Sequence, residues 1–400
     1  MIPRPDYIEQ LDRWRDRDLI KVVTGVRRCG KSTLLQLYAE HLQAEGVDSD
    51  QVIVINLEQL EYEHLLDYHK LHDEVLARAK PGKMNYVFID EVQNVPEFQR
   101  AVDSLYTRDN LDLYITGSNA LMLRGTLATL LSGRYVEVSM LPLSFKEFCG
   151  ASDASTSRQR LYDRYISTGG MPGAFTQTDG SLGLYDYLEG ILSTVLFKEV
   201  AQRLNIANTQ GLDALATYLF DNVGNLTSAK AISDFITSQG IRISPNTVSE
   251  YISGLVDSYI FYPAKRFDLR GKRLLKLQEK YYGVDMGMRR MVLSGRIRDT
   301  GRILENVVFL ELKRRYKNVY IGKVGNAEVD FVVESAEGYA YYQVAETVSS
   351  SATLKRELQA LRSVQDDYPK YLITMDDADE VSHQGISQVY ALDWLLGCVA

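Results

Sequence analysis

The sequence predicts an α/β protein whose N-terminal part is built on a parallel β-sheet. Short apolar runs alternate with stretches of helical periodicity, and the runs occupy residues 19–24, 52–57, 85–90, 111–116 and 134–139. Strands that alternate with helices form parallel sheets covered on both faces. In addition, the first run leads into a glycine-rich loop and then into a helix, and the third run ends in two carboxylates.

The glycine-rich loop fits the pattern G-x-x-x-x-G-K-[ST] over residues 25–32. Together with the next position it gives the candidate nucleotide-binding set: Gly25, Val26, Arg27, Arg28, Cys29, Gly30, Lys31, Ser32 and Thr33. Glycines let backbone N–H groups close around phosphate oxygens, and the N-terminus of the following helix adds partial positive charge. We expect Lys31 to reach the β- and γ-phosphates and the Ser32 hydroxyl to ligate Mg²⁺.

The third apolar run ends in Asp90 and Glu91. In phosphate-loop enzymes an Asp at such a strand end holds Mg²⁺, so Asp90 is a candidate metal ligand. A Glu directly after it can polarise water as a general base, which favours hydrolysis over transfer to another substrate. The fourth run leads to Ser118 and Asn119, and we expect this strand to lie beside the loop strand. Either residue would then sense the γ-phosphate or orient water; the alternative is that both only cap a turn.

These segments resemble an AAA-type ATPase of the kind found in many prokaryotic ATP-binding proteins. Besides the loop, the resemblance is carried by residues 88–93, 116–119, 131–134 and 141–148, and it covers essentially the whole chain. It implies that the nucleotide is ATP and that the cofactor is Mg²⁺. It also implies that Arg134 stabilises charge on the γ-phosphate, of its own chain or of a neighbouring subunit. The alternative for Arg134 is a structural ion pair at the sheet edge.

The resemblance further implies three domains. They are an AAA-type ATPase domain at 1–150, a helical and winged-helix domain at 151–280, and a degenerate nuclease-like α/β domain at 281–400. Within the middle part, residues 158–225 have helical periodicity that is interrupted at 169–173.

Residues 226–280 have the pattern of a winged helix. Two amphipathic helices, near 229–236 and from Pro245 onward, precede a hairpin expected to pair 259–262 with 274–277. The second helix would expose Asn246, Thr247, Ser249, Glu250 and Ser253. Because none of these is Lys or Arg, reading of base edges by this helix is not favoured.

The hairpin itself is basic, since residues 264–280 contain seven Lys or Arg against two acids. Such a wing would meet the phosphates of duplex DNA without reading its sequence. The candidate DNA contacts are Lys265, Arg266, Arg270, Lys272 and Arg273. The alternative is a packing module that couples the ATP state to the C-terminal domain.

The C-terminal part resembles the core of the PD-(D/E)xK nuclease fold, in which an Asp and a Glu hold Mg²⁺ and a Lys aids water activation. Asp330 matches the Asp, but Gln343 replaces the second carboxylate and Ala345 stands where the Lys is expected. Loss of a charged ligand and of the Lys weakens metal-assisted hydrolysis. We therefore expect the fold without nuclease activity, unless a Lys from elsewhere, such as Lys355, takes part.

Composition sets the remaining expectations. The net charge of −8 does not favour a general nucleic-acid binder. Three widely separated cysteines, no apolar run near the roughly 20 residues of a membrane span, and no signal-peptide layout indicate a cytoplasmic protein. We expect an ATPase whose turnover rearranges the C-terminal parts on DNA. The alternatives are a nucleotide-gated regulatory scaffold that binds a protein partner and hydrolyses slowly, and an active Mg²⁺ nuclease; self-association stays open.

Overall fold

The computed structural model describes residues 1–120, 131, 133–175, 181–206, 209–275, 278–295, 299–377 and 381–399. The chain divides into two compact units, Met1–Met140 with Asp257–Tyr259, and Leu141–Val256 with Ile260–Ala400. The boundary expected at residue 280 falls inside the second unit, and that finer division stays a prediction. No described helix is long and apolar enough to cross a membrane.

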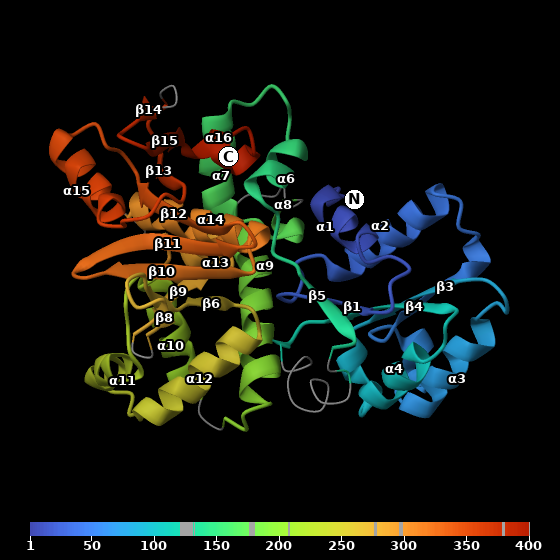
Figure 1. Ribbon diagram of the computed structural model, residues 1–400. Coiled ribbons are helices and arrows are strands. Elements are labelled where there is room, and N and C mark those ends of the chain that lie inside the picture. The colour runs from blue at the N-terminus through green and yellow to red at the C-terminus, as the bar shows by residue number, and fades with distance from the viewer. Residues whose placement is uncertain are drawn as a thin grey trace. The chain divides into compact units, whose positions relative to one another are not determined.

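In the first unit, the described residues form a five-stranded parallel sheet with the order β2-β3-β4-β1-β5 (Figure 1). The strands are β1 (Ile20–Thr24), β2 (Val52–Asn56), β3 (Asn85–Asp90), β4 (Leu111–Gly117) and β5 (Tyr135–Ser139). Each agrees with its predicted run to within one residue. Because β4 lies between β1 and β3, the fourth run is beside the loop strand, as expected.

Helices cover both faces of this sheet. They are α1 (Pro5–Asp12), α2 (Lys31–Ala44), α3 (Tyr68–Arg78) and α4 (Phe98–Tyr106). In Figure 1, α1 and α2 lie on one face and α3 and α4 on the other. Alternate residues of β3 serve the two faces, since Val87 packs in the core of α3 and α4 and Phe88 contacts Tyr38 of α2. Burial on both faces explains why the central strands are continuous apolar runs.

Lys21 is a charged exception inside β1, with no exposed surface. Its Nζ donates to the Asp112 carboxylate of β4 and to the carbonyl oxygen of Arg17 at 3.0 Å. Asp112 also accepts from Asp16 N at 3.1 Å and from the Tyr114 hydroxyl at 2.8 Å. Burial lowers the pKa of Lys21 and raises that of Asp112, and each charge opposes the shift of the other. The pair is therefore held by a complete set of hydrogen bonds.

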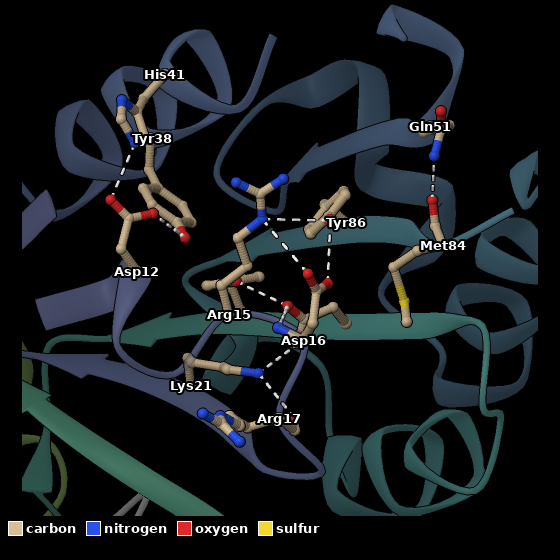
Figure 2. A network of polar contacts seen from close by, with 12 residues as sticks. Asp12, Arg15, Asp16, Arg17, Lys21, Tyr38, His41, Gln51, Met84 and Tyr86 are labelled. Carbon is tan, nitrogen blue, oxygen red and sulfur yellow. Dashed lines mark hydrogen bonds and ion pairs between the residues drawn. The ribbon is translucent and has the colours of Figure 1, made fainter. Parts of the chain in front are cut away.

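Figure 2 shows how this ion pair joins a wider polar network at the amino ends of the strands. Tyr86 of β3 donates to Asp16 at 3.0 Å. Asp12 at the end of α1 accepts from Tyr38 at 2.9 Å and contacts the His41 ring at 3.0 Å. The network ties the segment between α1 and β1 to the sheet and to α2.

The second unit begins with helices and ends in a mixed sheet. Its helices are α6 (Phe145–Gly150), α7 (Arg158–Thr168), α8 (Pro172–Phe175), α9 (Ser181–Ser193), continued by a π-helical segment (Thr194–Ala201), α10 (Gln210–Asp221), α11 (Ala229–Ser238), α12 (Pro245–Asp257), α13 (Met286–Val292), α14 (Thr300–Arg315), α15 (Ser351–Arg362) and α16 (Ala391–Leu396). Its strands are β6 (Phe261–Ala264), β7 (Arg266–Asp268), β8 (Arg273–Leu274), β9 (Lys280–Gly283), β10 (Asn318–Val324), β11 (Ala327–Ser335), β12 (Gly338–Ala345), β13 (Lys370–Thr374), β14 (Val381–Ser382) and β15 (Ile386–Tyr390). Among the described residues, β6 and β9 pair by themselves, and the others form one sheet in the order β14-β15-β13-β12-β11-β10-β7-β8.

The break between α7 and α8 wraps around a buried carboxylate. Asp285 accepts from Gly170 N at 2.7 Å and from Met288 N at 2.9 Å. Burial raises its pKa to about 6, although these N–H donors act in the opposite direction. Gly169 has φ +81°, and a Cβ there would lie 2.1 Å from an Asp285 oxygen. Gly169 therefore makes room for this carboxylate, and Gly170 makes room for the Leu143 carbonyl oxygen, which would lie 2.5 Å from a Cβ there.

The hairpin after α12 differs from the expected one. In the structure β6 pairs with β9, with Phe261 opposite Gly283, and the tip forms a separate short hairpin of β7 and β8. β7 also joins β10 of the large sheet in parallel. Residues 276 and 277 of the expected strand lie outside the described residues. Burial explains the correction, because β9 is buried throughout whereas β8 is exposed.

Two helices cover opposite faces of the large sheet. Phe309 of α14 contacts Phe331 of β11, whereas the next residue, Val332, packs in one core cluster with Leu358 and Leu361 of α15. Neighbouring residues of a strand face opposite sides, so one strand supplies both cores. The predicted helix at 304–315 and the predicted strand pair, now β11 with β12, are present.

The buried pair of Lys21 and Asp112 gives the first prediction. The Lys21→Met change leaves a buried carboxylate without its cation and should lower the free energy of unfolding of the first unit by about 3–5 kcal/mol. Urea denaturation measures this loss. As a control, Arg13→Gln removes an ion pair with Glu9 whose side chains are 65% and 66% exposed; its loss should stay below about 1 kcal/mol. A loss as small as that of the control would show that the pair is dispensable.

Candidate functional site

The glycine-rich loop follows the carboxyl end of β1 and leads into α2. Gly25 has φ +149° and Gly30 has φ +104°, which side chains rarely allow. A Cβ on Gly25 would lie 2.1 Å from the Met140 carbonyl oxygen, so the backbone passes too close to β5 for any other residue. Gly30 stands before the first residue of α2 and has no side chain to cap it. The first N–H groups of this 14-residue helix are therefore suited to an anionic ligand.

Lys31 points back into the loop. It is 4% exposed, and its Nζ donates to the carbonyl oxygens of Gly25 at 3.2 Å and Val26 at 3.4 Å. The same nitrogen lies 3.5 Å from Oε1 of Glu91, which follows β3. These contacts hold the ammonium group above the loop, where phosphate oxygens would take their place.

Asp90 lies at the end of β3 and is 3% exposed. Its oxygens accept from the Thr116 hydroxyl at 2.5 Å and from Asn56 Nδ2 at 3.1 Å. Burial raises its pKa, and hydrogen bonds from Ser32 and Thr116 act against that shift. Ser32 and Asp90 are thus side by side, although 58 positions separate them in the sequence.

Glu91 is 6% exposed and has a left-handed backbone with φ +53°. Its N–H donates to Thr116 Oγ1 at 2.9 Å. Its carboxylate accepts from Gln93 Nε2 and, at 3.4 Å, from the Ser118 hydroxyl. The backbone and the carboxylate of Glu91 are thus both held, the former by β4 and the latter by the residues around it.

The remaining loop residues surround this cluster. Val26 and Cys29 are buried, Arg28 is exposed, and Arg27 forms an ion pair with Glu58 at 2.9 Å. Burial raises the pKa of the Cys29 thiol, which argues against a reactive thiolate. Thr33 and Asn119 are partly exposed, the former on α2 and the latter just after Ser118.

Arg134 does not join the cluster. Its carbonyl oxygen accepts from Ile20 N, so it lies at the amino ends of β1 and β5, whereas the loop follows the carboxyl end of β1. Its guanidinium forms an ion pair with Asp103 at 2.6 Å. The expectation that Arg134 acts on a nucleotide of its own chain is therefore set aside, because parallel strands place it at the wrong end. Action on a neighbouring subunit stays a prediction.

The candidate DNA contacts lie on and around the β7–β8 hairpin. Lys265, Arg270, Lys272 and Arg273 are exposed, and Arg266 is half-buried on β7. The helix before this hairpin, α12, begins as expected, because Ser244 Oγ accepts from Thr247 N at 3.1 Å.

The acids of the C-terminal part meet a lysine that the sequence analysis missed. Lys280 of β9 lies 3.2 Å from Glu305 of α14 and 3.0 Å from Glu328 of β11, with Nζ measured to Oε1 in each case. Asp330 of β11 belongs to the same cluster, since its charge acts on Lys280. Lys355, the lysine considered from sequence, is exposed on α15.

Two polar residues of the first cluster were also missed. Asn56 and Thr116 both hydrogen-bond Asp90, and both end or nearly end an apolar run. The rule that singled out Asp90, a polar residue at a strand end, would have found them. Arg4 is a third, since it is 3% exposed and donates to the Cys29 carbonyl oxygen at 3.2 Å; no sequence signal marks it.

Comparison with known proteins agrees with this geometry. Residues 17–149 match the family described as the AAA domain, and residues 159–297 match a domain of unknown function. An uncharacterized protein of Haemophilus influenzae is 38% identical over 401 residues, which is 99% of each chain. The chain belongs to the family of that protein.

Two further proteins are similar to this chain, one in sequence and one in fold. An uncharacterized protein of Methanocaldococcus jannaschii is 29% identical over 334 residues, 78% of this chain and 72% of that one. A Walker-type ATPase of Pyrococcus abyssi has a similar fold, with a TM-score of 0.52 and 15% identity, covering 73% of this chain and 96% of that one. This chain thus contains an N-terminal AAA domain, followed over residues 159–297 by a domain of unknown function.

The close approach at Gly25 gives a prediction for the loop. The Gly25→Ala change drives a methyl group into the Met140 carbonyl and should weaken ATP binding at least about tenfold, because a backbone shift of the loop misplaces its N–H groups. Titration with a fluorescent ATP analogue measures the effect. Gly46→Ala is the matched control, since Gly46 has φ +96° and nothing lies within 4 Å of the place that its methyl group would take. Equal affinities of the two variants would contradict the assigned role of Gly25.

Proposed function

We propose that the first unit binds ATP with Mg²⁺ and hydrolyses it, and that turnover rearranges the second unit. The observation that carries the proposal is the convergence of Lys31, Asp90 and Glu91 in one buried cluster beside the glycine-rich loop. The match to the AAA domain and the likeness in fold to a Walker-type ATPase support it. ATP rather than GTP rests on the family resemblance.

Each residue of the cluster has its own role in the proposed reaction. Lys31 exchanges the loop carbonyls for β- and γ-phosphate oxygens. A water oxygen attacks the γ-phosphorus, the bond to the bridging oxygen breaks, and the proton of the water passes to the Glu91 carboxylate. Gln93 and Ser118, which donate to Glu91, hold that carboxylate in place, and Asn119 is the candidate to orient the water.

Ser32 and Asp90 are the residues that would hold Mg²⁺, which neutralises phosphate charge when bound. They fit this ion because both offer oxygen atoms and lie within hydrogen-bond contact of each other. Among the described residues no three His, Cys, Asp or Glu side chains converge as metal ligands. The pair of Ser32 and Asp90 suits Mg²⁺, because this ion usually takes one or two protein oxygens and completes its coordination shell with phosphates and waters.

Duplex DNA is the proposed partner of the second unit. The exposed basic residues of the β7–β8 hairpin support it, and so does the succession of two helices, α11 and α12, and a strand pair, β6 and β9, which is compatible with a winged helix. The wing would contact phosphates without reading sequence.

A nucleotide-gated scaffold for a protein partner is the second candidate. The exposed residues of α12, among them Asn246, Ser249 and Glu250, favour it, because they offer no cation to DNA. For the nuclease alternative, Gln343 and Ala345 remain unfavourable replacements.

Steady-state ATP hydrolysis tests the core of the proposal. Glu91→Gln should keep ATP binding but lower kcat by about 10²–10⁴-fold, because the general base is lost. Lys31→Ala should lose both binding and turnover. Arg13→Gln, on the surface beside α1, serves as the control and should hydrolyse ATP at the wild-type rate. Full turnover in Glu91→Gln would remove Glu91 from the mechanism.

Salt-dependent binding of a DNA duplex tests the partner. The triple change Arg270→Glu, Lys272→Glu and Arg273→Glu should abolish most binding and reduce the slope of log K against log salt by about three. The matched control makes the same charge change at exposed residues of the first unit, Arg13→Glu, Lys70→Glu and Lys83→Glu. Equal weakening by both triples, or no binding by the wild type, would favour the scaffold.

A further inference from the structure

A buried lysine lies in the middle of the C-terminal acids. Lys280 is 5% exposed and is the first residue of β9. Its ammonium contacts Glu305 at 3.2 Å and Glu328 at 3.0 Å. Burial alone would lower the pKa of Lys280, but the charges of Glu305, Asp330 and Glu328 together raise it. The lysine is therefore charged, because the neighbouring acids stabilise its ammonium form.

The acids in turn depend on this one cation. Asp330 accepts from Val344 N at 2.9 Å, and its pKa is raised to about 8 by burial and by the charge of Glu305, against the effect of Lys280. Glu305 accepts further from the Tyr282 hydroxyl at 2.7 Å. Glu305 and Asp330 are buried or nearly so, whereas Glu328 is 33% exposed. Carboxylates that are largely removed from water need a cation, either a metal ion or a basic side chain.

Gln343 adds no charge to the cluster. Its Oε1 accepts from Asp330 N at 3.2 Å, and its Nε2 donates to Glu357 at 2.9 Å. A divalent ion bound beside Asp330 would therefore gain no charged ligand from position 343, where the nuclease pattern has its second carboxylate. It would also stand within a few ångströms of the ammonium group, where like charges repel strongly.

We infer that the Lys280 ammonium takes the place of a divalent cation in this acid cluster, so that the cluster is neutralised from within the chain. Metal binding and Lys280 are then alternatives. Removal of the lysine should open a site for a divalent or trivalent ion, with Glu305 and Glu328, the two carboxylates that contact the ammonium group, as protein ligands. The inference is independent of the proposed ATP hydrolysis.

Terbium luminescence of the full-length protein tests this, because Tyr282 touches Glu305 and would sensitise a Tb³⁺ ion bound there. The Tyr282→Phe change is made in each protein, and the emission that it removes is the signal from this cluster. Emission that remains comes from Tb³⁺ bound elsewhere, including the proposed Mg²⁺ site. The wild type and Lys280→Arg should show no Tyr282-dependent emission. Lys280→Met should show Tyr282-dependent emission, and adding Glu328→Gln to that variant should reduce it. In Lys280→Met, saturating Mn²⁺ should also raise Tm by about 5 °C.

The outcomes decide as follows. Tyr282-dependent emission in the wild type overturns the inference, and so does a folded Lys280→Met protein that shows no Tyr282-dependent emission. If Lys280→Met does not fold, the wild type and Lys280→Arg still decide. If Lys280→Arg folds and shows no Tyr282-dependent emission, the cluster requires an internal cation, as inferred. Tyr282-dependent emission from the wild type or from Lys280→Arg contradicts the inference.

Discussion

An ammonium group taken out of water must be compensated by carboxylates or carbonyl oxygens, and much of this structure is arranged to do so. Among the described residues the buried lysines are Lys21, Lys31 and Lys280. Each lies on a helix or strand and has carboxylate or carbonyl oxygens in contact with its ammonium group. Lys21 is inside β1, Lys31 begins α2, and Lys280 begins β9.

The three lysines differ in how closely oxygen atoms contact their ammonium groups. This difference corresponds to whether the lysine is available to bind a ligand. Lys21 has a carboxylate in direct contact that is itself fully hydrogen-bonded, so the pair is closed. Lys31 has two carbonyl contacts at 3.2 and 3.4 Å and a carboxylate at 3.5 Å. Phosphate oxygens can replace such long contacts without leaving a bare charge. A compensation of this kind suits a group that must bind and release a ligand.

The sequence predicted the strands and the loop of the first unit well, because their signals are local. Apolar runs and glycines at fixed spacing depend on a few adjacent residues, and Asp90 was found by its place at a strand end. The order of strands in the sheet depends on contacts between distant segments. For that reason Thr116 and Asn56 were missed as partners of Asp90, and the sequence did not show that Arg134 lies at the amino ends of β1 and β5.

The same limit applied in the second unit. Lys280 follows a run of basic residues, so composition grouped it with an exposed wing, whereas the pairing of β6 with β9 buries it. The nearest acids come from α14 and β11, 25 and 48 positions later in the chain. No pattern within one segment could indicate that meeting.

Gln343 and Lys280 are two parts of one charge balance rather than two separate departures from the nuclease pattern. The amide of Gln343 joins Asp330 to Glu357 because it carries an acceptor at one end and donors at the other. A Gln343→Glu change would keep the first contact but place a carboxylate against Glu357, which already relies on Arg356 for its charge. With Lys280 still in place, the added carboxylate would have no cation of its own. Restoring one residue of the nuclease pattern would therefore create a buried, unpaired charge and not a metal site.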